Sequence, residues 1–289
     1  MIRENDQMLD NVDADEVSPK LDGQALDDGE APDERVAPGD REARQASQRV
    51  AALLWDPPAP SGRGPRPKLA LDEVVTAAIR LADAHGFDAL TMRAIARSLG
   101  VATMSLYTYL PGKAELFELM IDRAYGGREL PDRDLPWRAR YEFHVREALA
   151  MYRRHPWMLR ANLARLPVGP HVLDVSEDLL HVGLSAGLDA ATRARMEELI
   201  QAYVYGVASK EHSDQEEARR SGMSVDEFWA SRAEFWDTYF DLHRYPTMVN
   251  TWESGVYDSD ADAEEEATFA LAIILDGLER FVANVHQED

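Results

Sequence analysis

Apolar residues recur along most of this chain at the spacing of amphipathic helices. Between residues 71 and 82 they fall at i, i+3, i+4, i+7, i+8 and i+11, which predicts a helix with one buried face. Gly86 follows as a C-cap. Thr91 is placed to cap a second, shorter helix, and Gly100 ends it. Two helices separated by a tight connection are therefore expected at the start of the folded region.

The same periodicity continues to the end of the chain. A third helix is expected over about 102–110 and a fourth over 113–125, with Pro111 and Gly112 between them. Six further helices are predicted at about 137–154, 156–165, 171–186, 190–212, 224–244 and 263–285. No segment alternates as a half-buried strand does, so the predicted fold class is all-α.

The first 60 residues have a different composition. Residues 1–40 hold thirteen Asp and Glu against three basic residues, and residues 1–48 have few large apolar side chains. We therefore expect residues 1–60 to be a disordered acidic tail and linker, with one or two helical turns over 49–55. The tail is interpreted either as a phosphate mimic that competes with nonspecific DNA, or as a solubilising or wrongly annotated extension.

A short pattern within residues 92–109 meets the requirements of a helix-turn-helix. Ala96 is small where two helices cross, Gly100 suits a turn with positive φ, and Leu106 follows six residues later. This spacing alone is weak evidence, because it also occurs by chance. Its position after a capped helix and before a fourth helix makes it specific.

At these residues the sequence resembles a known family. The segments at 90–96, 99–101 and 106–116 are similar to the signature of the TetR/AcrR family of repressors. The resemblance implies an N-terminal three-helix DNA-binding domain, here residues 61–113 with a basic arm, and a helical ligand-binding and dimerisation domain, here residues 114–289. It also implies a homodimer that reads a palindromic operator. Thr108 and Met104 depart from the common pattern, so no operator sequence can be inferred.

The start of the third helix carries the residues that we expect to read bases. In this geometry the recognition helix enters the major groove, where hydroxyls bond base edges and methyl groups contact thymine. The base-reading candidates are Ala102, Thr103, Met104 and Ser105.

Four other residues are candidates for contact with phosphates. Tyr107 and Tyr109 can donate phenolic hydrogen bonds, and Thr91 lies at a helix N-terminus. Lys113 opposes the dipole of the fourth helix, so a phosphate neighbour explains its position better than stability does. The alternatives are that Tyr109 packs in the core and that Lys113 pairs with Glu115.

Residues 61–68 form a Gly- and Pro-rich arm that contains Arg63, Arg66 and Lys68. Such an arm can reach a phosphate backbone or the minor groove, although it could also be a solvated linker. The net charge of −22 is unusual for a DNA-binding protein. Residues 61–113, however, carry seven basic and four acidic side chains, so the positive charge is concentrated where the motif lies.

The last helix is apolar almost all round, which predicts burial on more than one side. By the family resemblance, it and the 190–212 helix form a four-helix interface with a second copy; the alternative is a helix buried within one subunit. The interface candidates are Ile200, Val204, Ile273, Ile274, Gly277 and Phe281.

Aromatic residues and methionines concentrate in the 137–165 and 224–244 segments. Most such stripes are core, but pockets in helical bundles have similar walls, and the resemblance places a pocket in the regulatory domain. The candidates for contact with a small, largely apolar effector are Phe143, Met151, Trp157, Met158, Tyr203, Phe228, Trp229, Phe235, Trp236 and Tyr239.

Several other classes of protein are disfavoured. The chain has no cysteine, no apolar stretch long enough for a membrane span and no apparent leader, so we expect a cytoplasmic protein. It lacks phosphate-loop, metalloprotease and nucleophile-elbow motifs, and His171 and His181 are spaced too far apart to share a metal ion. We therefore expect no catalytic residue, cofactor or metal. The alternatives are an architectural DNA-binding protein without a ligand and, less favoured, a helical enzyme.

Overall fold

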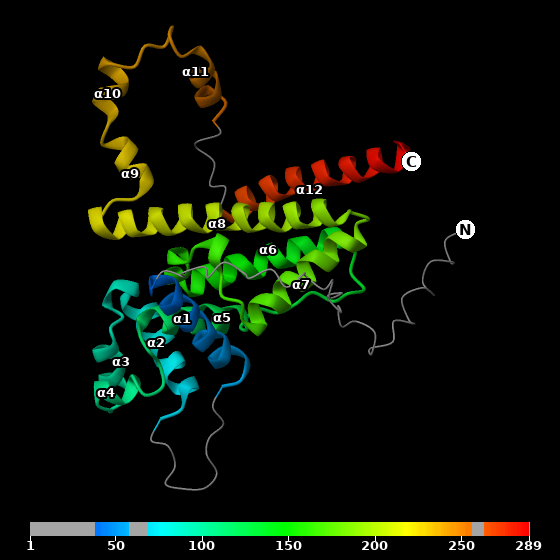
Figure 1. The fold of residues 1–289 in the computed structure, drawn as a ribbon. Coiled ribbons are helices and arrows are strands. Elements are labelled where there is room, and N and C mark those ends of the chain that lie inside the picture. The colour runs from blue at the N-terminus through cyan, green and yellow to red at the C-terminus, as the bar shows by residue number, and fades with distance from the viewer. Residues whose placement is uncertain (1–37, 58–68, 256–262, 289) are drawn as a thin grey trace. The chain divides into compact units, whose positions relative to one another are not determined.

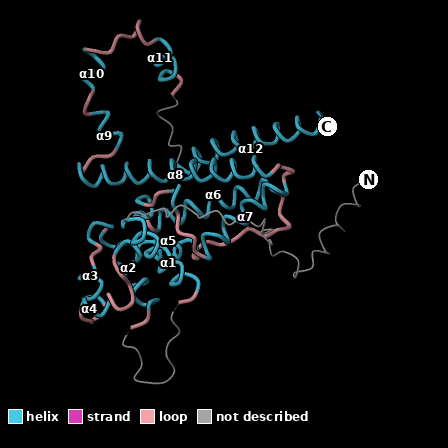
Figure 2. Tube along the Cα trace, in the orientation of Figure 1, coloured by secondary structure: helices cyan, strands magenta, loops and turns pink. Residues whose placement is uncertain are grey.

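A computed structural model describes residues 38–57, 69–255 and 263–288, and in these ranges the regular elements are all helices (Figure 2). The chain divides into the units Met1–Ala43 and Arg44–Asp289, and the second contains everything described below apart from the start of α1. No helix in the described ranges is both long and apolar enough to cross a bilayer. The predicted all-α class is confirmed.

The helices follow the predicted order closely. The α-helices are α1 Pro38–Trp55, α2 Leu71–His85, α3 Met92–Ser98, α4 Thr103–Leu106, α5 Lys113–Tyr125, α6 Trp137–Arg154, α7 Pro170–Ser185, α8 Ala190–Ser221, α9 Val225–Ala230, α10 Ala233–Thr238, α11 Pro246–Glu253 and α12 Ala263–Glu288. The 3₁₀ helices are η1 Phe87–Ala89, η2 Pro156–Arg160 and η3 Leu163–Arg165.

Helices α2 to α4 form the predicted helix-turn-helix. The Thr91 hydroxyl caps α3 by accepting a hydrogen bond from the Ala94 amide at 3.1 Å, and Gly100 adopts φ +67° in the turn. Helix α4 ends at Leu106 and not at 110 as predicted, because the amides of Tyr109 and Leu110 both bond to the Leu106 carbonyl in a closing turn.

The larger part of the fold is built on α6, α7 and α8, which pack against one another. Helix α5 contacts both α2 and α7, so it joins the helix-turn-helix to this bundle (Figure 1). The predicted 156–165 helix is instead the pair η2 and η3, which begins at Pro156. A proline ring is tolerated only in the first turn of a helix, so Pro156 begins η2 and does not continue α6.

Residues 222–255 connect α8 to α12 and contain the short helices α9, α10 and α11 (Figure 1). This segment is called the excursion below. Helix α8 continues to Ser221, beyond the predicted end at 212. The single helix predicted over 224–244 is divided into α9 and α10, and α11 was not predicted. No residue from 222 to 255 is buried. This excursion therefore packs mainly on itself.

Helix α1 differs from the expected tail. It begins at Pro38, so residues 38–48 are helical where a disordered segment was predicted. Its C-terminal half is held by tertiary contacts: Val50 is buried, and the Trp55 indole donates a 2.8 Å hydrogen bond to the Val168 carbonyl before α7. The acidic composition of residues 1–40 indicates disorder, but it gives no information on the apolar stripe that starts later in α1. Residues 1–37 lie outside the described ranges.

Candidate functional site: a nucleic-acid interface and a cavity

The short helix α4 is fixed by its inner side. Leu106 of α4 and Leu110, four residues later, are fully buried and belong to the same apolar cluster as Ile95 and Ala96 of α3. The Val101 amide donates a 3.0 Å hydrogen bond to the Ala96 carbonyl, which closes the turn between the two helices. These are the contacts that the spacing of Ala96, Gly100 and Leu106 predicts. The seam leaves the opposite side of α4 free to contact another molecule.

That opposite side contains the predicted base-reading residues. Ala102 and Ser105 are exposed, Thr103 is half-buried and the Met104 side chain is 76% exposed. A methionine with this exposure buries little apolar surface within the chain itself. Its position fits a contact surface, although the base contacts stay a prediction.

The predicted phosphate-contacting residues have different surroundings. Tyr107 is 46% exposed, whereas Tyr109 is half-buried against the core. Lys113 lies 4.1 Å from the centre of the Phe87 ring and donates a 3.1 Å hydrogen bond to the Phe87 carbonyl. Lys113 therefore has a local partner, Phe87, in place of the alternative partner Glu115, and its contact with a phosphate stays a prediction.

Arg93 and Arg97 of α3 are also exposed, and they are not among the predicted DNA contacts. The local positive balance of residues 61–113 was the signal that could have identified them. Arg63, Arg66 and Lys68 lie outside the described residues, so the proposed arm contacts stay a prediction.

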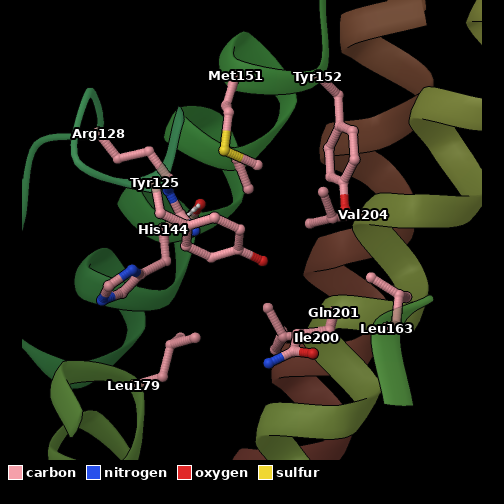
Figure 3. A pocket seen from close by; sticks show the side chains of 11 residues that line it. Tyr125, Arg128, His144, Met151, Tyr152, Leu163, Leu179, Ile200, Gln201 and Val204 are labelled. Carbon is pink, nitrogen blue, oxygen red and sulfur yellow. Dashed lines mark hydrogen bonds between the residues drawn. The ribbon is translucent and has the colours of Figure 1, made fainter. Parts of the chain in front are cut away.

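A small cavity lies among α5, α6, α7, α8 and η3 (Figure 3). It encloses about 20 Å³, room for about one water molecule, and it opens into a wider space of about 350 Å³ that includes solvent. Its walls are Tyr125, Arg128, His144, Ala148, Met151, Tyr152, Leu163, Leu179, Ile200, Gln201 and Val204. The hydroxyl of Tyr125 points into this space in Figure 3. Burial raises the pKa of Tyr125 and of Tyr152, so both phenols stay neutral.

Among the described residues that line this cavity, only Arg128 carries a formal charge at pH 7. One of its terminal nitrogens donates a 3.0 Å hydrogen bond to the His144 carbonyl, and its Nε is buried without a partner. Burial lowers the pKa of Arg128 from its usual value, an effect that the nearby Tyr125 and Glu147 oppose.

A buried charged cluster lies behind the His144 side of the cavity. Asp178 of α7 accepts a 2.9 Å bond from Arg140 of α6 and lies 2.8 Å from Nε2 of His144. All three side chains are almost fully buried. Burial, opposed by the Asp178 hydrogen bond, lowers the pKa of His144 to about 4, so this imidazole is neutral at pH 7. The cluster fixes α6 against α7.

The predicted effector contacts are only partly found at this cavity. Met151 lines it, but Tyr203 donates instead to the Ala267 carbonyl, which joins α8 to α12. Trp157 is buried and donates a 2.7 Å hydrogen bond to Asp83 of α2. Met158 is buried elsewhere in the core, and Phe143 is half-buried beneath Arg146.

The aromatic residues of the excursion are far more exposed than a pocket wall would be. Trp229 is 50% exposed, Phe235 46% and Tyr239 74%. Together with Phe228 they contact one another and other rings of the excursion, with Trp236 at the centre. These residues do not line the cavity described above, so their contact with an effector stays a prediction. Helical periodicity does not specify which neighbour covers a face.

The predicted interface residues also separate into two groups. Ile200 and Val204 are buried within the subunit, where they line the cavity, so they are not available to a partner. On α12, Ile273 is 58% exposed, Phe281 is 48% exposed and Gly277 is exposed. Ile274 is half-buried against the core. The outward face of α12 is therefore the part of the predicted interface that remains open.

Two family models match this chain. Residues 74–120 match the bacterial regulatory proteins of the tetR family, and residues 130–282 match the tetracyclin repressor-like C-terminal domain. The HTH-type transcriptional repressor DrrR1 of Streptomyces coeruleorubidus is 41% identical over 237 residues, which is 81% of this chain and 86% of the relative. An HTH-type transcriptional regulator of Saccharopolyspora erythraea is 26% identical over 229 residues, or 78% of this chain and 92% of the relative.

Solved structures show the same fold. Apo ActR from Streptomyces coelicolor has a TM-score of 0.64 at 23% identity, covering 75% of this chain and 98% of ActR. ActR in complex with actinorhodin has a TM-score of 0.62 at 25% identity, covering 73% and 95%. With both halves matched by family models and a relative above 40% identity, this chain belongs to the TetR family of bacterial regulatory proteins.

Proposed function

We propose that this protein is a ligand-responsive transcriptional repressor, which binds a palindromic operator as a homodimer in the cytoplasm and releases it when a small molecule enters the cavity. The observation that carries this proposal is the exposed side of α4, held in place by the fully buried Leu106. The repressor DrrR1, at 41% identity, supports repression as the sign of regulation. The ActR complex with actinorhodin supports a small-molecule effector.

The outward face of α12 supports the homodimer. Phe269, Ile273, Gly277 and Phe281 follow one another at intervals of four residues, and all are exposed. A Cβ at Gly277 would meet no atom within 4 Å. A row of large apolar side chains in water is unfavourable, so a second copy is the expected cover.

Sedimentation tests this interface. The wild-type protein should sediment at twice 32.5 kDa at micromolar concentration, and Ile273→Asp should yield monomers because it places a charge in an apolar contact. Leu184→Asp is the matched control, since Leu184 is 51% exposed and belongs to another helix, α7. A wild-type monomer, or a dimer that tolerates Ile273→Asp, would refute the interface.

Contacts between the cavity region and the DNA-reading helices supply a route for release. Asp83 of α2 accepts hydrogen bonds from Trp157 of η2 at 2.7 Å and lies 2.8 Å from Nδ1 of His155. Tyr205 of α8 donates to the carbonyl of Leu159, also in η2, at 2.9 Å. A ligand that shifts η2 would therefore displace α2. The change in occupancy can be no larger than the ligand's preference between the two conformations.

Release requires reciprocal coupling, which a titration can measure. Tryptophan fluorescence should show that the effector binds more weakly when the operator is present, by the same factor by which it weakens operator binding. Coupling of about 1–3 kcal/mol is sufficient. Equal effector affinity with and without operator would show that the ligand is not an inducer. That result would favour the alternative, an architectural DNA-binding protein.

A further inference from the structure

Among its described residues, the cavity wall contains one cation, Arg128, and no anion. Arg128 brings a guanidinium with five N–H donors, and none of the ion pairs in the described part of the chain includes it. One N–H meets the His144 carbonyl, and Nε is enclosed without a partner. The nearest acid, Glu147, accepts instead from the Glu129 amide. None of the described residues that line the cavity carries a carboxylate.

The other polar groups of the wall are two phenols, the neutral imidazole of His144, whose Nδ1 has no partner, and the Gln201 amide; none of them carries a negative charge. Tyr125 and Tyr152 carry phenols that burial keeps protonated. Tyr125 lies beside the guanidinium, whose carbon is 5.6 Å from the centre of its ring. The amide nitrogen of Gln201 donates to Glu197 at 3.2 Å, outside the wall. The remaining walls are apolar, with Met151, Leu179 and Val204 among them (Figure 3).

We propose that the effector is an anion: an apolar, ring-bearing molecule with a carboxylate or an ionised phenol or enol that pairs with Arg128. A buried cation favours such a partner strongly, because charge-assisted hydrogen bonds in a low-dielectric site exceed those between neutral groups. Tyr125 adds a neutral donor on the same side. The apolar wall would then cover the rings, which must first widen a space that holds about one water molecule in this structure. This proposal rests on the proposed function only in taking the cavity as the effector site.

Calorimetry with defined probes tests the proposal on the full-length protein without DNA. The probes are 2-naphthoate and its neutral isostere 2-naphthamide. Wild-type protein should bind 2-naphthoate at least about tenfold more tightly than 2-naphthamide, the difference expected for a hydrogen bond to a charged group. Arg128→Gln should remove that preference by weakening 2-naphthoate alone, and Arg128→Lys should restore part of it.

Arg146→Gln is the matched control, since it removes the same charge from an exposed position of α6 outside this cavity. It should leave both affinities unchanged. The proposal is overturned by no saturable binding of 2-naphthoate at millimolar concentration, by equal binding of the two probes to wild type, or by an Arg128→Gln protein that loses both probes equally. In the last case Arg128 only supports the fold. Charge-selective binding without operator release would support this inference while refuting release.

Discussion

The buried Asp178 carboxylate provides a stringent test of the packing between α6 and α7. Changing Asp178→Asn removes the negative charge and keeps the size of the side chain. The Arg140 guanidinium, which is fully buried, would then lose the partner that it meets at 2.9 Å. Removing one member of a buried ion pair costs roughly 3–5 kcal/mol, because the remaining charge is left uncompensated in a low-dielectric interior.

Urea unfolding followed by circular dichroism measures this loss. With a denaturant slope of about 3 kcal/mol/M, the midpoint should fall by about 1–2 M. Protein concentration must be fixed, since dimerisation contributes to stability. The matched control is Asp214→Asn, which breaks the exposed pair with Lys210 on α8 and should change the free energy of unfolding by less than about 1 kcal/mol. Equal midpoints for the two variants would refute the assigned role of Asp178.

Three further predictions follow from single residues. The pKa of His144 is lowered from 6.5 to about 4, so the unfolded chain binds its proton first as pH falls. Stability should therefore decrease by roughly 3 kcal/mol between pH 6.5 and 4, and His144→Gln should flatten that part of the profile. Thr91→Ala should reduce the free energy of unfolding by about 1 kcal/mol, because it removes the cap of α3. Thr108→Ala, at an exposed position, is the control and should leave the free energy of unfolding unchanged. Leu106→Ala should cost about 2–5 kcal/mol and abolish DNA binding, and a folded, DNA-binding Leu106→Ala protein would contradict the seam.

Local signals predicted the DNA-reading helices well. Thr91 and Gly100 act through their own backbone, so their roles follow from residue type alone. The length of α4 was overestimated, since hydrophobic periodicity continues through the turn that closes on the Leu106 carbonyl. A period of 3.6 residues does not distinguish a helix from a short helix followed by a turn of similar curvature.

The cavity was harder to predict because it depends on tertiary neighbours. Val204 and Ile273 both lie on apolar helical stripes, yet one is buried inside the subunit and the other is exposed. Sequence periodicity shows which face of a helix is apolar, but it does not show which helix or partner packs against that face. Arg128 follows Gly126 and Gly127 in a loop, where nothing in the local sequence indicates that a cavity encloses its Nε.

Aromatic content alone does not identify the residues of a pocket wall. Trp229 and Trp236 contact each other at 5.9 Å between ring centres and leave the cavity of their own subunit untouched. A cluster of rings has the same composition whether it lines a pocket, fills a core or forms an excursion. The exposed fractions of these side chains separate the possibilities, and they depend on tertiary packing. The break between α9 and α10 was equally hard to predict, because Ser231 and Arg232 are not strong helix breakers.

Selection of random DNA duplexes by the purified full-length protein tests the central claim most directly. The wild-type protein should enrich a palindrome whose half-sites lie about one helical turn apart, as two copies of α4 in a symmetric dimer require. Met104→Ala or Thr103→Ala should change the preference at one base step per half-site, with a cost of about 1–3 kcal/mol at that step. Failure of folded wild-type protein to enrich any motif at low salt would contradict the account.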